Sequence, residues 1–347
     1  MGVQQHKVSV IGSGNWGSSI ARLIAQNVRK QPELFHETVR VWVFEEEVNG
    51  RKLTDIINQD HENVKYLPGI RLPDNVVALP NIQDAARDAN ILVFVLPHQF
   101  VYQTCEKLRG VIHSECRAIS LIKGLDFQND EIMLFSDEIS RILGIECSAL
   151  SGANLASEVA LEKYGESTIG SKNLEVDGKI FHKLFHTGYF NVTVISDYTG
   201  LQICGALKNV VAIAAGISDG LKYGNNTKSA FIRRGLLEMR KFGKTFFGGV
   251  HTETFFESCG VADLITTCAG GRNRKVAEAF IGSNKTIEQV EMELLNGQKS
   301  QGTTTALEVH RFLQARKMTD EFPLMTSVYQ VIYEGAPPES IIDALQH

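Results

Sequence analysis

The sequence of 347 residues predicts an α/β protein, in which a doubly wound, mainly parallel sheet is followed by an all-α C-terminal domain. Short apolar runs alternate with amphipathic helical patterns over the first 195 residues, as in a parallel sheet covered on both faces. Long helical patterns replace them after about residue 197. A glycine-rich segment follows the first apolar run, at the edge where such sheets bind ligands.

The elements of the first half follow from local composition. Segment 38–44 is rich in β-branched and aromatic residues, and segment 91–96 is wholly apolar and ends at Pro97, so both predict strands. Further strands are expected at residues 8–11, 76–79, 118–122, 147–150, 167–169 and 191–195. Helices are expected at residues 15–29, 50–59, 82–87, 100–108, 130–143 and 179–186.

The second half contains helical patterns alone, at residues 200–216, 229–246, 275–281, 287–295, 304–316 and 322–334. Pro337-Pro338 ends the last pattern before a short terminal helix. A chain of this length usually forms about two domains. The change of pattern near Ser196 predicts an α/β domain at residues 1–195 and a helical domain at residues 196–347.

The glycine segment Gly12-Ser-Gly14-Asn-Trp-Gly17 has the spacing and the strand-to-helix context of a dinucleotide pyrophosphate site. Gly12 permits a tight turn, Gly14 lets the backbone approach phosphate, and Gly17 lets the helix pack closely on the strand. The free N–H groups of that helix favour an anion. The first domain is therefore expected to be Rossmann-like.

The choice between NAD and NADP depends on the residues after the second strand. The acidic run Glu45-Glu46-Glu47 can accept a hydrogen bond from a ribose 2′-OH and would repel a 2′-phosphate, which favours NAD. Arg51 lies close enough in sequence to weaken that preference. A solvated charge run at the start of a helix is the alternative interpretation.

Two lysines stand in apolar surroundings. Lys123 follows the strand at 118–122 and precedes Gly124, which permits a turn beside a ligand. Lys208 lies in the middle of a helix that is apolar nearly all round. A buried ammonium must be paired, lose its proton or face a ligand, and burial can bring its pKa near neutrality. Lys208 is therefore a candidate general acid and base, with Asp263 as its partner.

The segment Gly270-Gly271-Arg272-Asn273 precedes a helical pattern, and this combination suits a phosphate monoester. Phe100 follows another strand end and is expected either beside a cofactor or in the core. His98 is a possible acid or base, although a structural role is more common. The polar loop at residues 296–302 is consistent with a flap over a cofactor.

Composition argues against several classes of function. The net charge of −5 disfavours a nucleic-acid partner. Six scattered cysteines without a Cys-x-x-Cys pair indicate reduced core thiols and fit the cytosol. His182 and His186 lack a further ligand nearby, so no metal is expected. No apolar run is expected to span a membrane, and the first hydrophobic run is not a signal peptide.

Together these motifs resemble the cytoplasmic NAD-dependent glycerol-3-phosphate dehydrogenases of animals, over residues 7–344. The resemblance rests on the glycine segment and on further stretches at residues 42–46, 61–69, 97–100, 121–124, 204–211, 257–268, 270–275 and 296–299. It implies a homodimer that interconverts glycerol 3-phosphate and dihydroxyacetone phosphate with NAD. The hydride is then expected to pass between the nicotinamide C4 and the substrate C2, in a cleft between the two domains.

The resemblance also implies residue roles. Lys208 would exchange a proton with the C2 oxygen, and Lys123, Asn209, Asp263 and Thr267 would complete that site. Arg272 and Asn273 would bind the substrate phosphate, with Lys123 as a further substrate contact. Cofactor contacts are implied for Gly12, Ser13, Gly14, Asn15, Trp16, Gly17, Phe44, Phe100, Ala156, Arg272, Lys299 and Gln301.

Two other functions fit parts of the sequence. A related two-domain dehydrogenase would act on a hydroxy acid or sugar acid without a substrate phosphate. A non-catalytic NAD sensor would bind the nucleotide without oxidising NADH, although it would need neither Lys208 nor Asp263. Ala269, Asn225 and Arg234 depart from the family's pattern, and none of them removes a catalytic group.

Overall fold

The computed structural model describes residues 5–128, 131–295 and 299–346, which form two compact units. One unit comprises Met1–Ile122 and Phe135–Tyr198, and the other comprises Lys123–Leu134 and Thr199–His347. The expected boundary between residues 195 and 196 assigned residues 123–134 to the first domain, whereas the structure places them in the helical unit. Phe127 makes an edge-on ring contact with Phe312 of the helical unit, which explains why the short segment belongs there.

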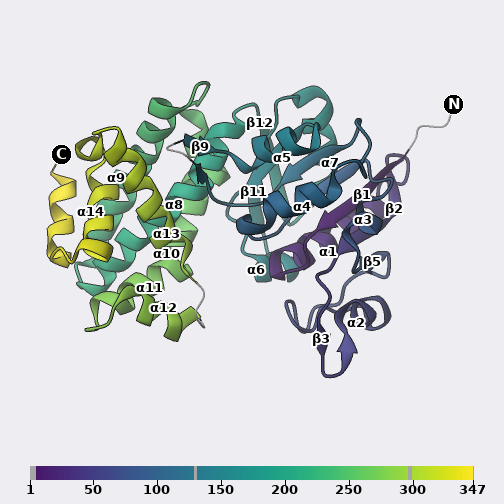
Figure 1. Ribbon diagram of the computed structural model, residues 1–347, viewed down its shortest axis with the longest axis horizontal. Coiled ribbons are helices and arrows are strands. Elements are labelled where there is room, and N and C mark those ends of the chain that lie inside the picture. The colour runs from purple at the N-terminus through teal and green to yellow at the C-terminus, as the bar shows by residue number, and fades with distance from the viewer. Residues whose placement is uncertain (1–4, 129–130, 296–298, 347) are drawn as a thin grey trace. The chain divides into compact units, whose positions relative to one another are not determined.

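The first unit is built on an eight-stranded sheet with the order β12-β11-β10-β7-β6-β1-β2-β5 (Figure 1). All neighbouring strands are parallel except β10 and β11, so the expected mainly parallel sheet is confirmed. The strands are β1 (His6–Ile11), β2 (Phe35–Trp42), β5 (Val76–Leu79), β6 (Ile91–Phe94), β7 (Arg117–Ser120), β10 (Cys147–Ser151), β11 (Gly165–Gly170) and β12 (Phe190–Ile195).

Helices cover both faces of this sheet, and each face has its own core. One core joins β1 and β2 to α1 (Asn15–Arg29), α2 (Leu53–Asp60) and α7 (Lys179–Phe185). The other core joins β6, β7 and β10 to α3 (Ile82–Ala86), α4 (Val101–Leu108) and α5 (Phe135–Leu143). Apolar strands buried on both faces require this arrangement. A short helix α6 (Ala156–Ala160) packs beside α1.

The second unit is mainly helical, as expected, and surrounds the long helix α8 (Tyr198–Gly220). Residues 199–218 of α8 are all buried, which explains why the helix is apolar nearly all round. The other helices are α9 (Gly224–Phe246), α10 (Asp263–Gly270), α11 (Arg272–Ile281), α12 (Ile287–Leu295), α13 (Gln301–Ala315) and α14 (Pro323–Tyr329). Short 3-10 and π-helical turns connect or extend several of them.

By length and composition α8 would also be able to cross a membrane, although no apolar run was expected to be long enough. The whole of its most apolar 18-residue stretch is buried within the protein. A core helix has the same composition as a membrane helix, because both are surrounded by apolar groups. The finding therefore matches the position of α8 in the centre of the unit.

Two expected helices begin later than predicted, because hairpins precede them. Residues 131–133, expected as helix, form β9 (Glu131–Met133), which pairs with β8 (Asp126–Gln128) before α5 begins. The short strands β3 (Glu47–Val48) and β4 (Arg51–Lys52) likewise precede α2. Asn49 and Gly50 both take positive φ angles there, 52° and 78°. Asn-Gly is a strong hairpin signal, and the helix expected from residue 50 was wrong at its start.

Candidate nucleotide-binding and catalytic sites

The glycine segment links β1 to α1, and its three glycines differ in what surrounds them. Gly12 has a φ of +122°, and a Cβ there would lie 2.1 Å from the Val95 carbonyl oxygen. A Cβ on Gly17 would lie 2.2 Å from the Gly12 carbonyl oxygen. A Cβ on Gly14 would meet nothing within 4 Å. Gly12 and Gly17 therefore serve the turn and the close packing, and Gly14 leaves open space at the start of α1.

Asn63 supports this turn and was not identified from sequence. Its fully buried amide donates 2.8 Å to the Ser13 carbonyl and 2.9 Å to the Ser18 hydroxyl, which also donates to Ser13. Asn15 and Trp16 begin α1, and the Trp16 ring packs near Phe190. A single buried Asn in a loop has no local pattern, so only the tertiary contact reveals its role.

Three other predicted cofactor residues lie in the first unit. Phe44 and Phe100 are 69% and 48% exposed, so neither is a core residue. Phe44 and Glu45 line a cavity of about 490 Å³ near the carboxyl ends of β2 and β5. Ala156 begins α6, and its carbonyl accepts a 3.0 Å hydrogen bond from Ser19 of α1. The cavity beside Phe44 can accept a flat ring system.

The acidic run after β2 is largely occupied by contacts within the protein. Glu45 accepts from the Thr54 hydroxyl at 2.6 Å and from the Thr54 N–H at 3.2 Å, near the start of α2. Glu46 binds Lys65 and Tyr66. Arg51, which weakened the preference for NAD, forms a 2.6 Å ion pair with Asp60.

A buried charge cluster in the second unit contains the two predicted lysines. The Lys208 Nζ donates to Asp263 Oδ1 at 2.5 Å and to Thr267 Oγ1 at 2.7 Å. The Lys123 Nζ donates to the other carboxylate oxygen of Asp263 at 2.9 Å. The side chains of Lys208 and Asp263 are only 7% and 5% exposed, so one carboxylate serves two ammonium groups in a nearly dry environment.

Local structure explains how these groups meet. Asp263 is the first residue of α10, directly after the π-helical turn Ser258–Ala262, and Thr267 lies one turn later on the same face. Gly124 has a φ of +134°, so the chain turns directly after Lys123, as expected. Lys208 lies near the middle of α8 and so has apolar residues on both sides.

Burial and charge set the protonation of the cluster. Burial and the charge of Lys123 lower the pKa of Lys208 to about 8, against the opposing effect of Asp263. Burial acts to raise the pKa of Asp263, but the charges of Lys123 and Lys208 outweigh it, and that pKa is lowered. Lys208 can therefore exchange a proton near neutral pH while Asp263 stays ionised.

Asn209 and Asn273 extend the cluster. The Asn273 amide donates 2.8 Å to Asn209 Oδ1, and Asn273 Oδ1 accepts from the Gly302 N–H at 3.0 Å. Arg272 is the first residue of α11 and is exposed. No carboxylate of residues 5–128, 131–295 or 299–346 lies within ion-pair distance of its guanidinium. Arg272 therefore keeps its charge available for an anion.

The remaining predicted residues have varied surroundings. Lys299 is exposed, and Gln301 begins α13 with Ser300 as the N-cap, so the expected polar loop ends two residues early. Residues 296–298 lie outside the described residues. The His98 ring packs 5.8 Å from that of Phe135, and His182 stacks on His186. Among the described residues no group of three potential metal ligands occurs.

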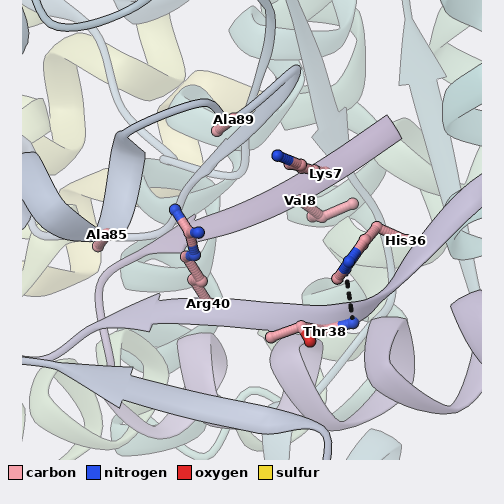
Figure 2. A pocket seen from close by; sticks show the side chains of 7 residues that line it. All are labelled: Lys7, Val8, His36, Thr38, Arg40, Ala85 and Ala89. Carbon is pink, nitrogen blue, oxygen red and sulfur yellow. Dashed lines mark hydrogen bonds between the residues drawn. The ribbon is translucent and has the colours of Figure 1, made fainter. Parts of the chain in front are cut away.

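A separate cavity of about 130 Å³ in the first unit contains none of the predicted site residues (Figure 2). It lies between α3 and the strands β1 and β2. Figure 2 shows the side chains of Lys7, His36 and Arg40 around it. The Arg40 guanidinium donates to the main-chain carbonyl of Arg87, just beyond the carboxyl end of α3.

Comparisons with known proteins cover nearly the whole chain. Residues 7–177 match the family described as NAD-dependent glycerol-3-phosphate dehydrogenase N-terminus, and residues 197–343 match its C-terminus. The cytoplasmic glycerol-3-phosphate dehydrogenase [NAD(+)] of Bos taurus is 54% identical over 342 residues, covering 98% of this chain and 97% of the relative. The glycerol-3-phosphate dehydrogenase 1-like protein of Mus musculus is 56% identical over 341 residues, with the same coverage.

A solved structure is similar to this chain over nearly its whole length. The glycerol-3-phosphate dehydrogenase structure from Saccharomyces cerevisiae is 48% identical, with a TM-score of 0.95, and covers 99% of this chain and 100% of that one. The predicted fold class, NAD dependence and enzyme class are confirmed by these matches. The chain belongs to the NAD-dependent glycerol-3-phosphate dehydrogenase family.

Proposed function

We propose that this chain catalyses the reversible conversion of sn-glycerol 3-phosphate and NAD to dihydroxyacetone phosphate and NADH. The observation that carries the proposal is the buried Lys208–Asp263–Lys123 cluster in a chain that belongs to this family. The alternative of an NAD sensor would leave the buried Lys208–Asp263 ion pair and the half-buried Lys123 without a use, although burying charges costs free energy.

We assign the acid–base role to Lys208. When bound, NADH supplies the hydride for C2 of the ketone. The Lys208 ammonium donates its proton to the C2 oxygen as negative charge develops there, and the neutral amine takes that proton back in the opposite direction. Asp263 and Thr267 hold the Nζ in position. Lys123 polarises the carbonyl and, by its charge, helps keep the pKa of Lys208 near neutrality.

The phosphate is assigned to Arg272 and Asn273. Arg272 is exposed without a carboxylate partner among the described residues, and the start of α11 presents free N–H groups. Binding of the phosphate, away from the reacting carbon, orients C2 for the reaction. Asn273 donates a hydrogen bond to Asn209, the residue next to Lys208, and this bond connects phosphate binding to the acid–base group.

We assign the cofactor to the glycine segment of the first unit, with Phe44, Phe100 and Ala156 as further contacts. The open space at Gly14 fits a pyrophosphate, because of the three glycines in this segment only Gly14 would carry a Cβ that meets no protein atom within 4 Å. Arg272, Lys299 and Gln301 are further proposed cofactor contacts, on the family resemblance. The chain is also proposed to act in the cytoplasm as a homodimer; relatives from Bos taurus and Rattus norvegicus are named cytoplasmic.

The test follows NADH absorbance with dihydroxyacetone phosphate and, separately, with dihydroxyacetone. We expect rapid oxidation of NADH with the phosphate ester and little with the free ketone. Lys208→Ala should lower turnover at saturating substrate by about 10²–10⁴-fold, the usual contribution of general acid–base catalysis. Lys228→Ala serves as the control, since it removes a half-buried, ion-paired lysine of the same unit that is not part of the cluster.

Three results would count against the proposal. Equal rates with both ketones would favour the hydroxy-acid or sugar-acid dehydrogenase. NADH binding without oxidation would favour the sensor. A loss below tenfold in Lys208→Ala would remove Lys208 as the acid and base.

A further inference from the structure

We propose that Glu291 is a positioning residue for the cofactor, because it holds the start of α13, where Lys299 and Gln301 flank the N-cap residue Ser300. This inference rests on the proposed function, in which those two residues contact NAD. Glu291 itself lies on α12 and is only 5% exposed, so it acts through its neighbours.

The contacts of Glu291 converge on the start of α13. Its Oε1 accepts from the Ser300 N–H at 2.9 Å and from the Thr303 hydroxyl at 2.7 Å. Ser300 is the N-cap of α13, and its hydroxyl accepts from the Thr303 N–H. Glu291 therefore bonds both the cap residue and the third residue of the helix, and its carboxylate lies where the helix dipole favours negative charge.

The environment of Glu291 indicates a specific role for its carboxylate. Among the described residues, no lysine or arginine lies within ion-pair distance of it. A buried carboxylate is costly unless its oxygens accept hydrogen bonds. The two donors at the start of α13 meet that need for Oε1, so moving the start of α13 away from Glu291 would leave this oxygen without these hydrogen bonds.

A second contact holds the opposite side of the same turn. The Gly302 N–H donates to Asn273 Oδ1, and a Cβ on Gly302 would lie 2.6 Å from the Asn209 carbonyl oxygen of α8. The turn therefore packs directly on the helix that carries Lys208. Glu291 fixes one side of the turn and Asn273 the other. The proposed cofactor contacts at the start of α13 are therefore held by hydrogen bonds to the proposed substrate residue Asn273 and to Glu291.

The test compares Glu291→Ala with Glu291→Gln. Both donors bind Oε1, so glutamine can keep both hydrogen bonds through its own oxygen, whereas alanine loses both. The matched control is Glu238→Ala. Glu238 is 2% exposed and likewise accepts from main-chain N–H groups at a helix start, Leu324 and Met325 of α14. Among the described residues Glu238 forms no hydrogen bond to α13, which makes it a structural counterpart.

Three quantities are measured for each variant: the melting temperature, the Kd of NADH by fluorescence titration, and kcat with KM for dihydroxyacetone phosphate. We expect Glu291→Ala to raise the Kd of NADH by about tenfold, the effect of one or two lost hydrogen bonds. Glu291→Gln should stay within about threefold of the wild type on the same reasoning. Glu238→Ala should lower the melting temperature and leave the Kd unchanged.

The proposal is overturned if Glu291→Ala changes the melting temperature as Glu238→Ala does while the Kd of NADH stays at the wild-type value. If Glu291→Ala does not fold, Thr303→Val, which removes one donor, decides the matter: an unchanged Kd overturns the proposal. A wild-type chain that binds NADH but does not reduce dihydroxyacetone phosphate contradicts the proposed function, and the Kd comparison still tests Glu291. A wild-type chain that does not bind NADH overturns both.

Discussion

Lys208 is the residue whose chemistry depends most on its surroundings. An exposed lysine is almost wholly protonated at neutral pH, with a pKa near 10.4. Burial and Lys123 lower the pKa of Lys208 to about 8. Its location in an apolar helix could be recognised from sequence, because a lysine there needs a partner or a ligand. Asn63 and Glu291 could not be recognised, since their roles come from contacts with distant loops and helix ends.

The pKa of Lys208 predicts opposite pH profiles for the two directions of reaction. Reduction needs the protonated amine, so its rate should fall as the pH rises through about 8, and oxidation needs the neutral amine, so its rate should rise there. Lys123→Gln removes a repelling charge and should move both profiles to higher pH, by about one pH unit. Rates measured from pH 6 to 10 in both directions check this. A profile that Lys123→Gln leaves in place would show that Lys123 does not influence Lys208.

At the scale of elements, the turn at Gly12 and the close packing at Gly17 were predicted correctly from the glycine spacing, and phosphate binding beside Gly14 stays a prediction. The two hairpins that precede α2 and α5 were missed for different causes. The hairpin β3–β4 has an Asn-Gly turn, and the prediction placed the start of a helix at this turn. The second, β8–β9, belongs to the helical unit, and its packing on Phe312 could not be deduced from residues 126–133 alone.

The different surroundings of Gly14 and Gly17 lead to a paired prediction. Gly17→Ala would place a methyl group 2.2 Å from the Gly12 carbonyl oxygen, so it should destabilise the protein by about 1–3 kcal/mol, as overpacking does. Gly14→Ala meets no protein atom within 4 Å, so it should keep its melting temperature and bind NADH at least about tenfold more weakly. Thermal unfolding and NADH titration separate the two effects. Undiminished NADH affinity in Gly14→Ala would place the pyrophosphate elsewhere.

At the scale of the whole molecule, the family resemblance predicts an assembly that no single contact reveals. We expect sedimentation equilibrium at micromolar concentration to give about twice the chain mass of 38.4 kDa. The net charge of −5 limits non-specific association, so a defined mass is expected rather than a broad distribution. A single species at the mass of one chain over the whole concentration range would contradict the homodimer.

The sequence by itself determined the family, the fold class, the glycine turn and the identity of the charged groups, because each depends on local spacing or on a long match to known motifs. Only the tertiary structure decided which groups share one carboxylate, how far burial lowers the pKa of Lys208, and that residues 123–134 fold with the helical unit. Hydrogen bonds and desolvation depend on atoms brought together from distant parts of the chain, and the order of residues alone does not contain those distances.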